Sequence, residues 1–376
     1  MKKVDFVFFD AGGGHRSAAT ALKAVVEQQG RPWEVRLVNL QEVLDSLDIF
    51  RKVTGIRMED VYNNLLAKGW TLGSEYLIPP MHGLIRLYYP AQRQLLTKFW
   101  KADPPDLVVS VIPNFARALY QGLKAADPNI PLATILTDLA DFPPHFWIER
   151  GQDQHLICGT ARAVEQAREF GYAAEKVHAT SGMILRPRFY DPIHVDRAEE
   201  RRKLGLQPDL PTGLVLFGGQ GSSVMLDIAK SMSQFDAGAQ LIFICGKNAK
   251  LAAKLREVQS SIPFHIVGFT QEVPYFMHLS DFMIGKPGPG SISEALAMKL
   301  PVIVERNAWT LPQERFNTDW VLEKGVGLVL KNFSEIEGAI QKLLSPDVFP
   351  RLKANVAAVE NRAVFEIPDI LEGIMR

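Results

Sequence analysis

The segment Leu214-Val-Leu-Phe-Gly-Gly-Gln-Gly-Ser-Ser223 decides the fold, because a short apolar run ends directly in a glycine-rich turn. Such a run is typical of a buried strand, and the glycines after it let backbone N–H groups approach an anion. The same order occurs at Val4–Phe9, which precedes Gly12-Gly-Gly14, and at Phe282–Ile284, which precedes Lys286-Pro-Gly-Pro-Gly290. A strand, a glycine-rich turn and a helix in succession indicate a parallel sheet covered by helices.

Outward from these turns, short apolar strands alternate with helical stretches in two series, which predicts an α/β protein. The first series adds Trp33–Leu40, Leu107–Ile112, Leu132–Leu136 and His155–Cys158, with a helix at about Ser17–Gln29. The second adds Gln240–Cys245, Phe264–Val267, Pro301–Val304 and Gly327–Leu330. We therefore expect two Rossmann-like domains facing across a cleft, residues 1–185 and 195–360, with a C-terminal helix in 361–376 that returns to the first.

The composition excludes several classes of protein. The chain has 376 residues, with 42 basic and 42 acidic ones, so binding of nucleic acid through overall charge is excluded. The two cysteines, Cys158 and Cys245, exclude a disulfide framework and indicate a reducing compartment. No apolar run reaches the ~20 residues of a membrane helix. We expect a soluble, cytoplasmic protein.

Residues 51–101 interrupt the strand and helix rhythm. This window holds eight basic and three acidic residues, together with Tyr62, Trp70, Tyr76 and further aromatic residues. Basic residues mixed with Tyr and Trp suit an anionic membrane surface. The alternative is a helical insertion whose aromatic residues are core and whose charges are solvated.

The first glycine-rich turn carries the first candidate catalytic residues. Asp10, Gly13, Gly14 and His15 follow a strand, where the carboxyl end of a parallel sheet binds ligands. The turn matches neither the P-loop nor the dinucleotide-binding pattern. His15 is therefore either a structural histidine or a functional one.

Three further turns suit a sugar nucleotide. The N–H groups of Gly219, Gln220 and Gly221 are candidates for a diphosphate, and Ser222 adds a hydroxyl. Gly290 and Ser291 precede Glu294, a spacing that predicts either a capping box or a phosphate site with a ribose ligand. Gln313, Glu314 and Asn317 form a polar cluster that is either a sugar site or the acidic start of a helix.

In this order and spacing, the motifs resemble those of the monogalactosyldiacylglycerol synthases, which are inverting glycosyltransferases of the GT-B fold related to MurG. The resemblance rests on Gly12-Gly-Gly-His15, Gly218-Gly-Gln-Gly-Ser222, Lys286-Pro-Gly-Pro-Gly-Ser291 and Pro312-Gln-Glu314 with Asn317. Thr137-Asp-Leu139, Phe146-Trp147 and Cys245-Gly-Lys-Asn248 extend it, so it covers nearly the whole chain.

The resemblance implies a role for each matching position. A UDP-sugar would bind the second domain, with its diphosphate on Gly219, Gln220, Gly221, Ser222, Gly290 and Ser291. Phe269 would lie against the uracil, Glu294 would hold the ribose, and Gln313, Glu314 and Asn317 would serve the hexose. His15 would activate the acceptor hydroxyl, with Asp138 and Asp10 as rival bases and Gly13 and Gly14 beside the acceptor. No metal and no cofactor beyond the UDP-sugar co-substrate is implied.

The sequence departs from the plant members of this family at two positions that bear on specificity. Ala140-Asp-Phe-Pro-Pro-His145 lacks their cysteine and histidine, and Leu311-Pro-Gln-Glu314 lacks the glycine of their donor loop. The first departure bears on the acceptor and the second on the hexose.

We therefore expect a glycolipid synthase that moves a hexose from UDP-hexose to a lipid hydroxyl such as that of diacylglycerol. It would act while peripherally associated with the cytoplasmic membrane, without nucleic acid. One alternative is a UDP-sugar 2-epimerase or another MurG-like glycosyltransferase with a different acceptor. The other is a non-catalytic protein that binds nucleotide-sugars or lipids.

Overall fold

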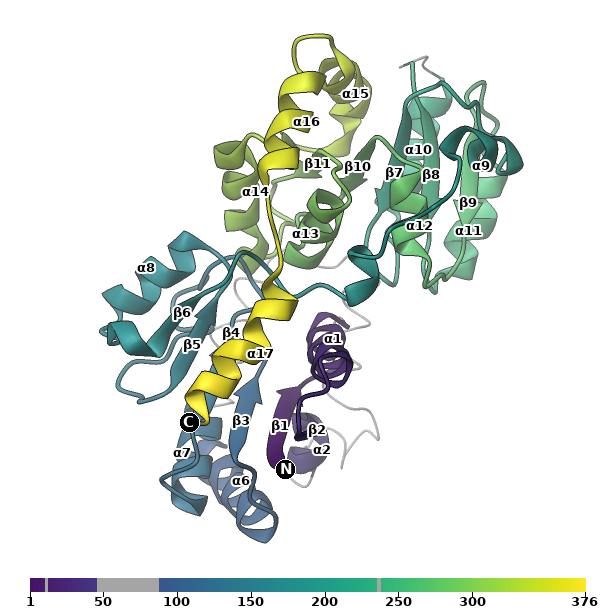
Figure 1. Ribbon diagram of the computed structural model, residues 1–376. Coiled ribbons are helices and arrows are strands. Elements are labelled where there is room, and N and C mark those ends of the chain that lie inside the picture. Colours follow the sequence, from purple (N-terminus) through teal and green to yellow (C-terminus); the bar gives the residue numbers. More distant parts are fainter. Residues whose placement is uncertain (11–12, 46–87, 235–237) are drawn as a thin grey trace. The chain divides into compact units, whose positions relative to one another are not determined.

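The computed structural model describes residues 1–10, 13–45, 88–234 and 238–376, and it divides them into two compact units (Figure 1). The first unit comprises the described residues up to Pro187 together with Asn361–Arg376, and the second comprises Arg188–Glu360. Each unit is built on one parallel six-stranded sheet. Among the described helices, none is long and apolar enough to cross a membrane.

The sheet of the first unit has the order β2-β1-β3-β4-β5-β6. Its strands are β1 Lys2–Phe8, β2 Trp33–Asn39, β3 Leu107–Ser110, β4 Leu132–Ile135, β5 His155–Cys158 and β6 Val177–Ala179. After β1 the chain passes to β2 on one side and then to β3 on the other. The loops that follow β1 and β3 therefore diverge, which is where doubly wound sheets bind ligands.

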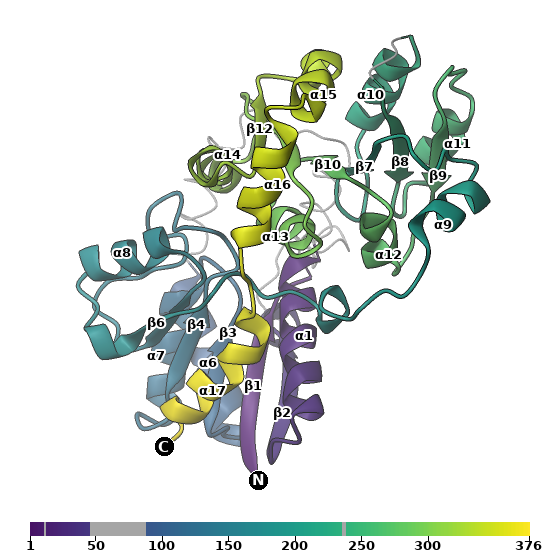
Figure 2. The ribbon, with the colours of Figure 1, turned by 45° about the horizontal axis from the view of Figure 1, so that its top comes forward.

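The α-helices of the first unit include the one predicted at about Ser17–Gln29 and the one predicted in 361–376. They are α1 Gly14–Gln28, α2 Leu40–Leu44, α6 Tyr89–Ala102, α7 Ala116–Ala126, α8 Ala161–Glu169 and α17 Ala363–Ile374. Helix α17 packs beside α1 (Figure 2). Arg31, in the turn that follows α1, forms ion pairs with Asp369 and Glu372 of α17, the latter at 2.9 Å.

The sheet of the second unit has the order β12-β11-β10-β7-β8-β9. Its strands are β7 Thr212–Leu216, β8 Gln240–Ile244, β9 Phe264–Val267, β10 Phe282–Gly285, β11 Val302–Glu305 and β12 Gly327–Leu330. In this sheet the loops that diverge are those after β7 and β10. These two strands pair directly, from Phe282↔Gly213 to Gly285↔Leu216. Two predicted phosphate-binding turns follow these two strands, so the topology brings them to one edge.

The longer helices of the second unit connect these strands. They are α9 Arg197–Lys203, α10 Val224–Ser233, α11 Ala249–Arg256, α12 Val273–His278, α13 Pro289–Ala297, α14 Pro312–Lys324, α15 Ile336–Leu344 and α16 Phe349–Ala358. The core lies between sheet and helices and includes the fully buried Phe243, Phe282 and Met225. Nearly continuous burial along β7, β8 and β10 is typical of strands covered on both faces.

Asp5, which interrupts the first apolar strand of the sequence, is fully buried in β1. Its carboxylate accepts two hydrogen bonds from Arg36 on the neighbouring strand, at 2.7 and 2.6 Å. Trp100 of α6 adds a third through Nε1 at 3.0 Å. A buried charge is tolerated when it is paired and hydrogen-bonded in this way, so Asp5 fixes β1, β2 and α6 together.

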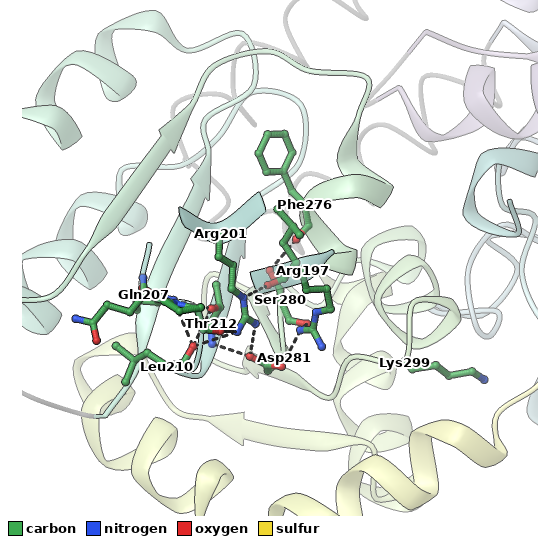
Figure 3. A network of polar contacts seen from close by, with 12 residues as sticks. Arg197, Arg201, Gln207, Leu210, Thr212, Phe276, Ser280, Asp281 and Lys299 are labelled. Carbon is green, nitrogen blue, oxygen red and sulfur yellow. Dashed lines mark hydrogen bonds and ion pairs between the residues drawn. The ribbon is translucent and has the colours of Figure 1, made fainter. Parts of the chain in front are cut away.

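The second unit carries a comparable network around Asp281, at the amino edge of its sheet (Figure 3). Asp281 accepts from Arg197 Nη2 at 2.8 Å, from Arg201 Nη2 at 2.7 Å and from the N–H of Thr212 at 2.8 Å. Burial alone raises the pKa of this carboxyl, but the Thr212 N–H and the two guanidinium groups hold it below its usual range. The network ties α9 to the start of β7 and to the start of β10 within the second unit.

Candidate functional site

The glycine-rich turn after β7 is held against the turn after β8. The N–H of Lys247 donates to the carbonyl of Gly219 at 2.9 Å. A Cβ on Gly246, where φ is +59°, would lie 2.2 Å from that carbonyl oxygen, and one on Gly221 would lie 2.9 Å from the carbonyl oxygen of Cys245. Both positions therefore require glycine. This packing leaves Gly219 and Gln220 exposed at the carboxyl edge of the sheet.

Helix α13 starts at the same edge, directly after β10. Its N-cap is Gly288, and its first internal hydrogen bond joins the N–H of Ile292 to the carbonyl of Gly288 at 3.1 Å. The N–H groups of Gly290 and Ser291 precede that bond and point out of the helix end. The capping-box interpretation of Ser291 and Glu294 is wrong, because both residues lie inside the helix and the N-cap side chain is absent. The helix end itself suits an anion.

The polar cluster of α14 lies beside this loop. Glu314 is nearly buried, and its Oε1 accepts from Lys286 Nζ at 2.8 Å. Asn317 is fully buried and donates through Nδ2 to the carbonyl of Pro287 at 2.7 Å. Gln313 is partly exposed at the start of the helix. Asn317 therefore fixes the loop that leads into α13, while Glu314 and Gln313 face the same edge.

Phe269 follows β9 and is 62% exposed, one of few large apolar side chains in the described residues with such exposure. The ammonium of Lys247 lies over its ring, 5.8 Å from the centroid. A flat apolar ring at the carboxyl edge is a surface on which a base can stack.

In the first unit, His15 lies in the first turn of α1, just after β1. Its Nδ1 is 3.3 Å from the hydroxyl of Thr137, which follows β4. Burial lowers the pKa of His15 to about 4, and a hydrogen bond with the backbone of Val111 opposes this shift. The imidazole is therefore neutral at neutral pH, which is the form that accepts a proton.

The two rival carboxylates differ in their surroundings. Asp138 accepts from Trp147 Nε1 at 2.8 Å, and the ring of Trp147 is 6.1 Å from that of His15. Asp10 forms a two-point ion pair with Arg16. Both oxygens of Asp10 are engaged by Arg16, so the geometry favours His15, with Asp138 nearby, over Asp10.

The sequence departs from the plant pattern at Ala140–His145. In this stretch, the side chain of Asp141 binds backbone N–H groups of the residues that follow it. This fully buried carboxylate accepts from the N–H groups of His145 at 2.9 Å and Trp147 at 2.6 Å. Burial raises the pKa of Asp141, while these N–H groups oppose the shift. The stretch thereby sets the position of Trp147, and through it that of Asp138.

In each sheet, the loops after two neighbouring strands diverge: those after β1 and β3 in the first unit and those after β7 and β10 in the second. We call these two places the switch points, and most of the predicted site residues lie there. Gly13 is the N-cap of α1 with φ +78°, and Gly14 begins that helix. Ser222 accepts from the N–H of Val224 at 3.3 Å, at the start of α10. Gly12 lies outside the described residues. Thr137, Trp147 and Lys286 had no predicted role, although each lies in a motif that carried the resemblance.

The basic and aromatic window is described only from residue 88 onward, so Tyr62, Trp70 and Tyr76 lie outside the described residues. Trp100 is buried, and Phe99 packs under Arg36, 5.0 Å from guanidinium carbon to ring centroid. Trp100 is therefore core, and Phe99 is partly buried. Arg93, Lys98 and Lys101 are exposed and line a shallow hollow of about 810 Å³ on α6.

Within the described residues, no group of three or more His, Cys, Asp or Glu side chains is placed to hold a metal ion.

The second unit matches a known family model. Residues 213–343 match the glycosyltransferase family 28 C-terminal domain, a segment that runs from β7 to α15 and includes both phosphate-suited turns and the α14 cluster. The whole chain is similar to the structure of MurG from Acinetobacter baumannii, with a TM-score of 0.63, 13% identity and coverage of 99% of this chain and 100% of that one. The chain therefore has the GT-B fold, and its second unit matches the C-terminal domain of a glycosyltransferase family.

Curated relatives confirm the resemblance to the monogalactosyldiacylglycerol synthases. The chain is 27% identical to monogalactosyldiacylglycerol synthase 1 of Arabidopsis thaliana over 92% of its length, and 27% identical to the synthase of Spinacia oleracea over 100%. It spans about two thirds of these relatives, 65% and 73% of their lengths.

A second kind of protein shares the fold. The UDP-GlcNAc 2-epimerase of Neisseria meningitidis, in its structure bound to UDP-GlcNAc, has a TM-score of 0.60, 15% identity and coverage of 99% of this chain and 100% of that one. Likeness at this identity concerns the fold alone.

The expected location at the cytoplasmic membrane is wrong. The curated relatives from Arabidopsis thaliana and Spinacia oleracea are both named as chloroplastic. Charge and composition of a folded domain do not reveal its compartment, because short targeting segments specify it.

Proposed function

We propose that this glycosyltransferase moves a hexose from a UDP-sugar to the hydroxyl of a lipid such as diacylglycerol, with inversion at the anomeric carbon. The observation that carries the proposal is the gathering, at the switch point of the second unit, of the β7 turn, the free end of α13 and the Lys286–Glu314 pair. The similarity to monogalactosyldiacylglycerol synthases supports the lipid acceptor.

The proposed donor site follows the order of the strands. Phe269 after β9 is proposed to stack on the uracil, and Glu294 of α13 to bond the ribose. The diphosphate would rest on the N–H groups of Gly219, Gln220, Gly221, Gly290 and Ser291, with the Ser222 hydroxyl beside it. Gln313 and Glu314 would bond the hexose, supported by Asn317. Helix ends and loop N–H groups can then stabilise the charge that builds on the UDP leaving group, so we propose a reaction without a metal.

Replacing Gly246 by alanine is expected to weaken UDP binding by at least about 10-fold. The new methyl would collide with the carbonyl of Gly219, 2.2 Å away, and φ of +59° disfavours any residue with a Cβ. The β7 turn or the turn after β8 must then shift to relieve this overlap. Calorimetric titration with UDP measures the loss. Gly238→Ala is the control, since its Cβ meets nothing within 4 Å at a similar φ of +65°; equal affinity losses in both variants would contradict the packing argument.

In the first unit, His15 is proposed to take the proton of the acceptor hydroxyl as that oxygen attacks the anomeric carbon. Gly13 and Gly14 open the start of α1 beside it, and Asp138 is proposed as the neighbouring carboxylate. Asp10 remains a weaker candidate because of its pairing with Arg16.

The acceptor implies work at a lipid surface, and α6 offers a basic face for it. Between Tyr89 and Ala102 the helix has three basic residues, Arg93, Lys98 and Lys101, and no acidic one. We propose that this face contacts an anionic membrane, where each basic residue contributes about 1 kcal/mol.

The double variant Lys98→Glu/Lys101→Glu is expected to lower binding to vesicles rich in phosphatidylglycerol, by about 10-fold or more, since it reverses two charges. Sedimentation with vesicles at low and high salt measures this, because added salt screens the attraction. Lys23→Glu/Lys254→Glu is the matched control on other surfaces. Unchanged sedimentation of the α6 variant would remove this face from the proposal.

A screen of donors and acceptors tests the function itself. The protein is incubated with UDP-galactose, UDP-glucose or UDP-GlcNAc, with and without diacylglycerol and with and without a chelator, and products are identified by mass. Glycolipid formed only with diacylglycerol supports the proposal. Conversion of the UDP-sugar without any acceptor would instead identify an epimerase, an activity found on the same fold. Tight UDP binding without any product would identify a non-catalytic binding protein.

A further inference from the structure

Lys286 occupies the centre of the switch point in the second unit. It follows β10 immediately, and its ammonium is 2.8 Å from Glu314 Oε1. Its Cε lies 3.9 Å from the place where a Cβ on Gly218 would be, and 3.4 Å from the corresponding place on Gly288. The side chain therefore contacts Glu314 at the start of α14 and lies close to the β7 turn and to the start of α13.

The two members of the pair differ in exposure. The side chain of Glu314 is 9% exposed and that of Lys286 is 39% exposed. A nearly buried carboxylate needs a partner, and Lys286 provides it. The lysine, in contrast, keeps part of its side chain accessible at the edge where α13 presents its N–H groups.

Gly288 keeps the pair open toward that edge. A Cβ there would come within 3.5 Å of Glu314 Oε1 and 3.8 Å of Lys286 Nζ. Because residue 288 is glycine, it places no side chain over the ammonium between the helix end and Glu314. An anion on the N–H groups of Gly290 and Ser291 would meet a full positive charge next to them.

We propose that Lys286 is a catalytic residue that binds the β-phosphate of the donor and that its pair with Glu314 holds it in place until the donor arrives. This inference rests on the proposed function. Hexose hydroxyls then take over as donors to the Glu314 carboxylate, and Lys286 turns its charge to the diphosphate. Recognition of the sugar and stabilisation of the leaving group are thereby coupled through one ion pair.

In the reaction, the acceptor oxygen forms a bond to the anomeric carbon and its proton passes to the base. The bond from that carbon to the β-phosphate oxygen breaks, and its electron pair stays on UDP. Lys286 remains an ammonium throughout and supplies only charge and a hydrogen bond.

The comparison of UDP with UMP tests this assignment, because UMP lacks the β-phosphate. Lys286→Met is expected to weaken UDP binding about 10- to 100-fold, the worth of one charge-assisted hydrogen bond, and to leave UMP binding nearly unchanged. Lys286→Arg should retain most of the UDP affinity. Glu314→Gln should bind UDP at least as tightly as the wild type while its KM for UDP-hexose rises. Lys254→Met, on the exposed face of α11, is the matched control.

Lys286→Met leaves the Glu314 carboxylate unpaired, so Lys286→Met/Glu314→Gln is measured beside it as a variant without a buried charge. The assignment is supported if the double variant also loses about 10- to 100-fold in affinity for UDP and little in affinity for UMP. Equal losses for UDP and UMP, or no loss for UDP, would show the pair to be structural and overturn the inference. Failure of the wild type to bind any UDP compound would instead defeat the proposed function.

Discussion

Replacing His15 by alanine is expected to lower the rate of sugar transfer by about 10²–10⁴ while leaving UDP affinity unchanged, because general-base assistance has that magnitude. The imidazole is neutral, lies at the carboxyl edge of the first sheet, and has the Thr137 hydroxyl 3.3 Å from Nδ1. His15 belongs to a different unit from the residues proposed to hold UDP. Single-turnover rates together with UDP titrations separate the two effects.

The pH profile gives this prediction a second readout. A base works only when deprotonated, so activity falls as the pH drops through the pKa of the base. Burial lowers the pKa of His15 to about 4, and the acidic limb of kcat/KM is therefore expected near that value rather than near 6.5. Asp138→Asn and Asp10→Asn are the companion variants. Full turnover in His15→Ala, with loss in either asparagine variant, would move the role of base to that carboxylate.

Replacing Asp281 by alanine is expected to reduce the free energy of unfolding of the second unit by about 3–5 kcal/mol, the cost of breaking a buried ion pair by removing one partner. The Arg201 side chain is only 7% exposed, and without Asp281 it would keep its charge in the core. The N–H of Thr212, at the start of β7, would lose its acceptor as well. Urea unfolding followed by the fluorescence of the second unit measures the loss.

One further variant and the pH dependence of unfolding calibrate the Asp281 result. Arg197→Met removes a partner that is 42% exposed, so it should cost at most about 1 kcal/mol. The lowered pKa of Asp281 also predicts a pH effect: the stabilisation is present above the unfolded pKa of about 3.8 and is lost as the pH falls through the lower, folded value. A loss below about 1 kcal/mol in Asp281→Ala would show that the network contributes little.

The strands of both sheets could be predicted from the sequence because parallel strands buried on both faces are short continuous apolar runs. Phe264–Val267 and Gly327–Leu330 are found at the predicted residues, and most others differ only at their ends. Strand β6 was missed, since Val177–Ala179 is three residues long and only partly buried. The capping box at Ser291 and Glu294 failed because Pro289 already starts the helix two residues earlier.

The parts of the candidate site that could be predicted from the sequence are the turns proposed to bind a ligand through their backbone N–H groups. The sequence shows where glycines follow a strand and precede a helix. Only glycine tolerates the close backbone packing found in these turns. The partners of side chains were not visible. Thr137 lies 122 positions from His15, and Glu314 lies 28 positions from Lys286.

The sequence by itself determined the repeated order of strand, glycine-rich turn and helix, the two-series α/β organisation and the family resemblance, because these depend on local periodicity and on glycine. Only the tertiary structure decided which turns share a sheet edge, which aromatic residues are core and which charged groups are paired. Strand order sets these relations: β10 returns beside β7 after two intervening strands, and this single pairing brings Lys286 to the turn after β7.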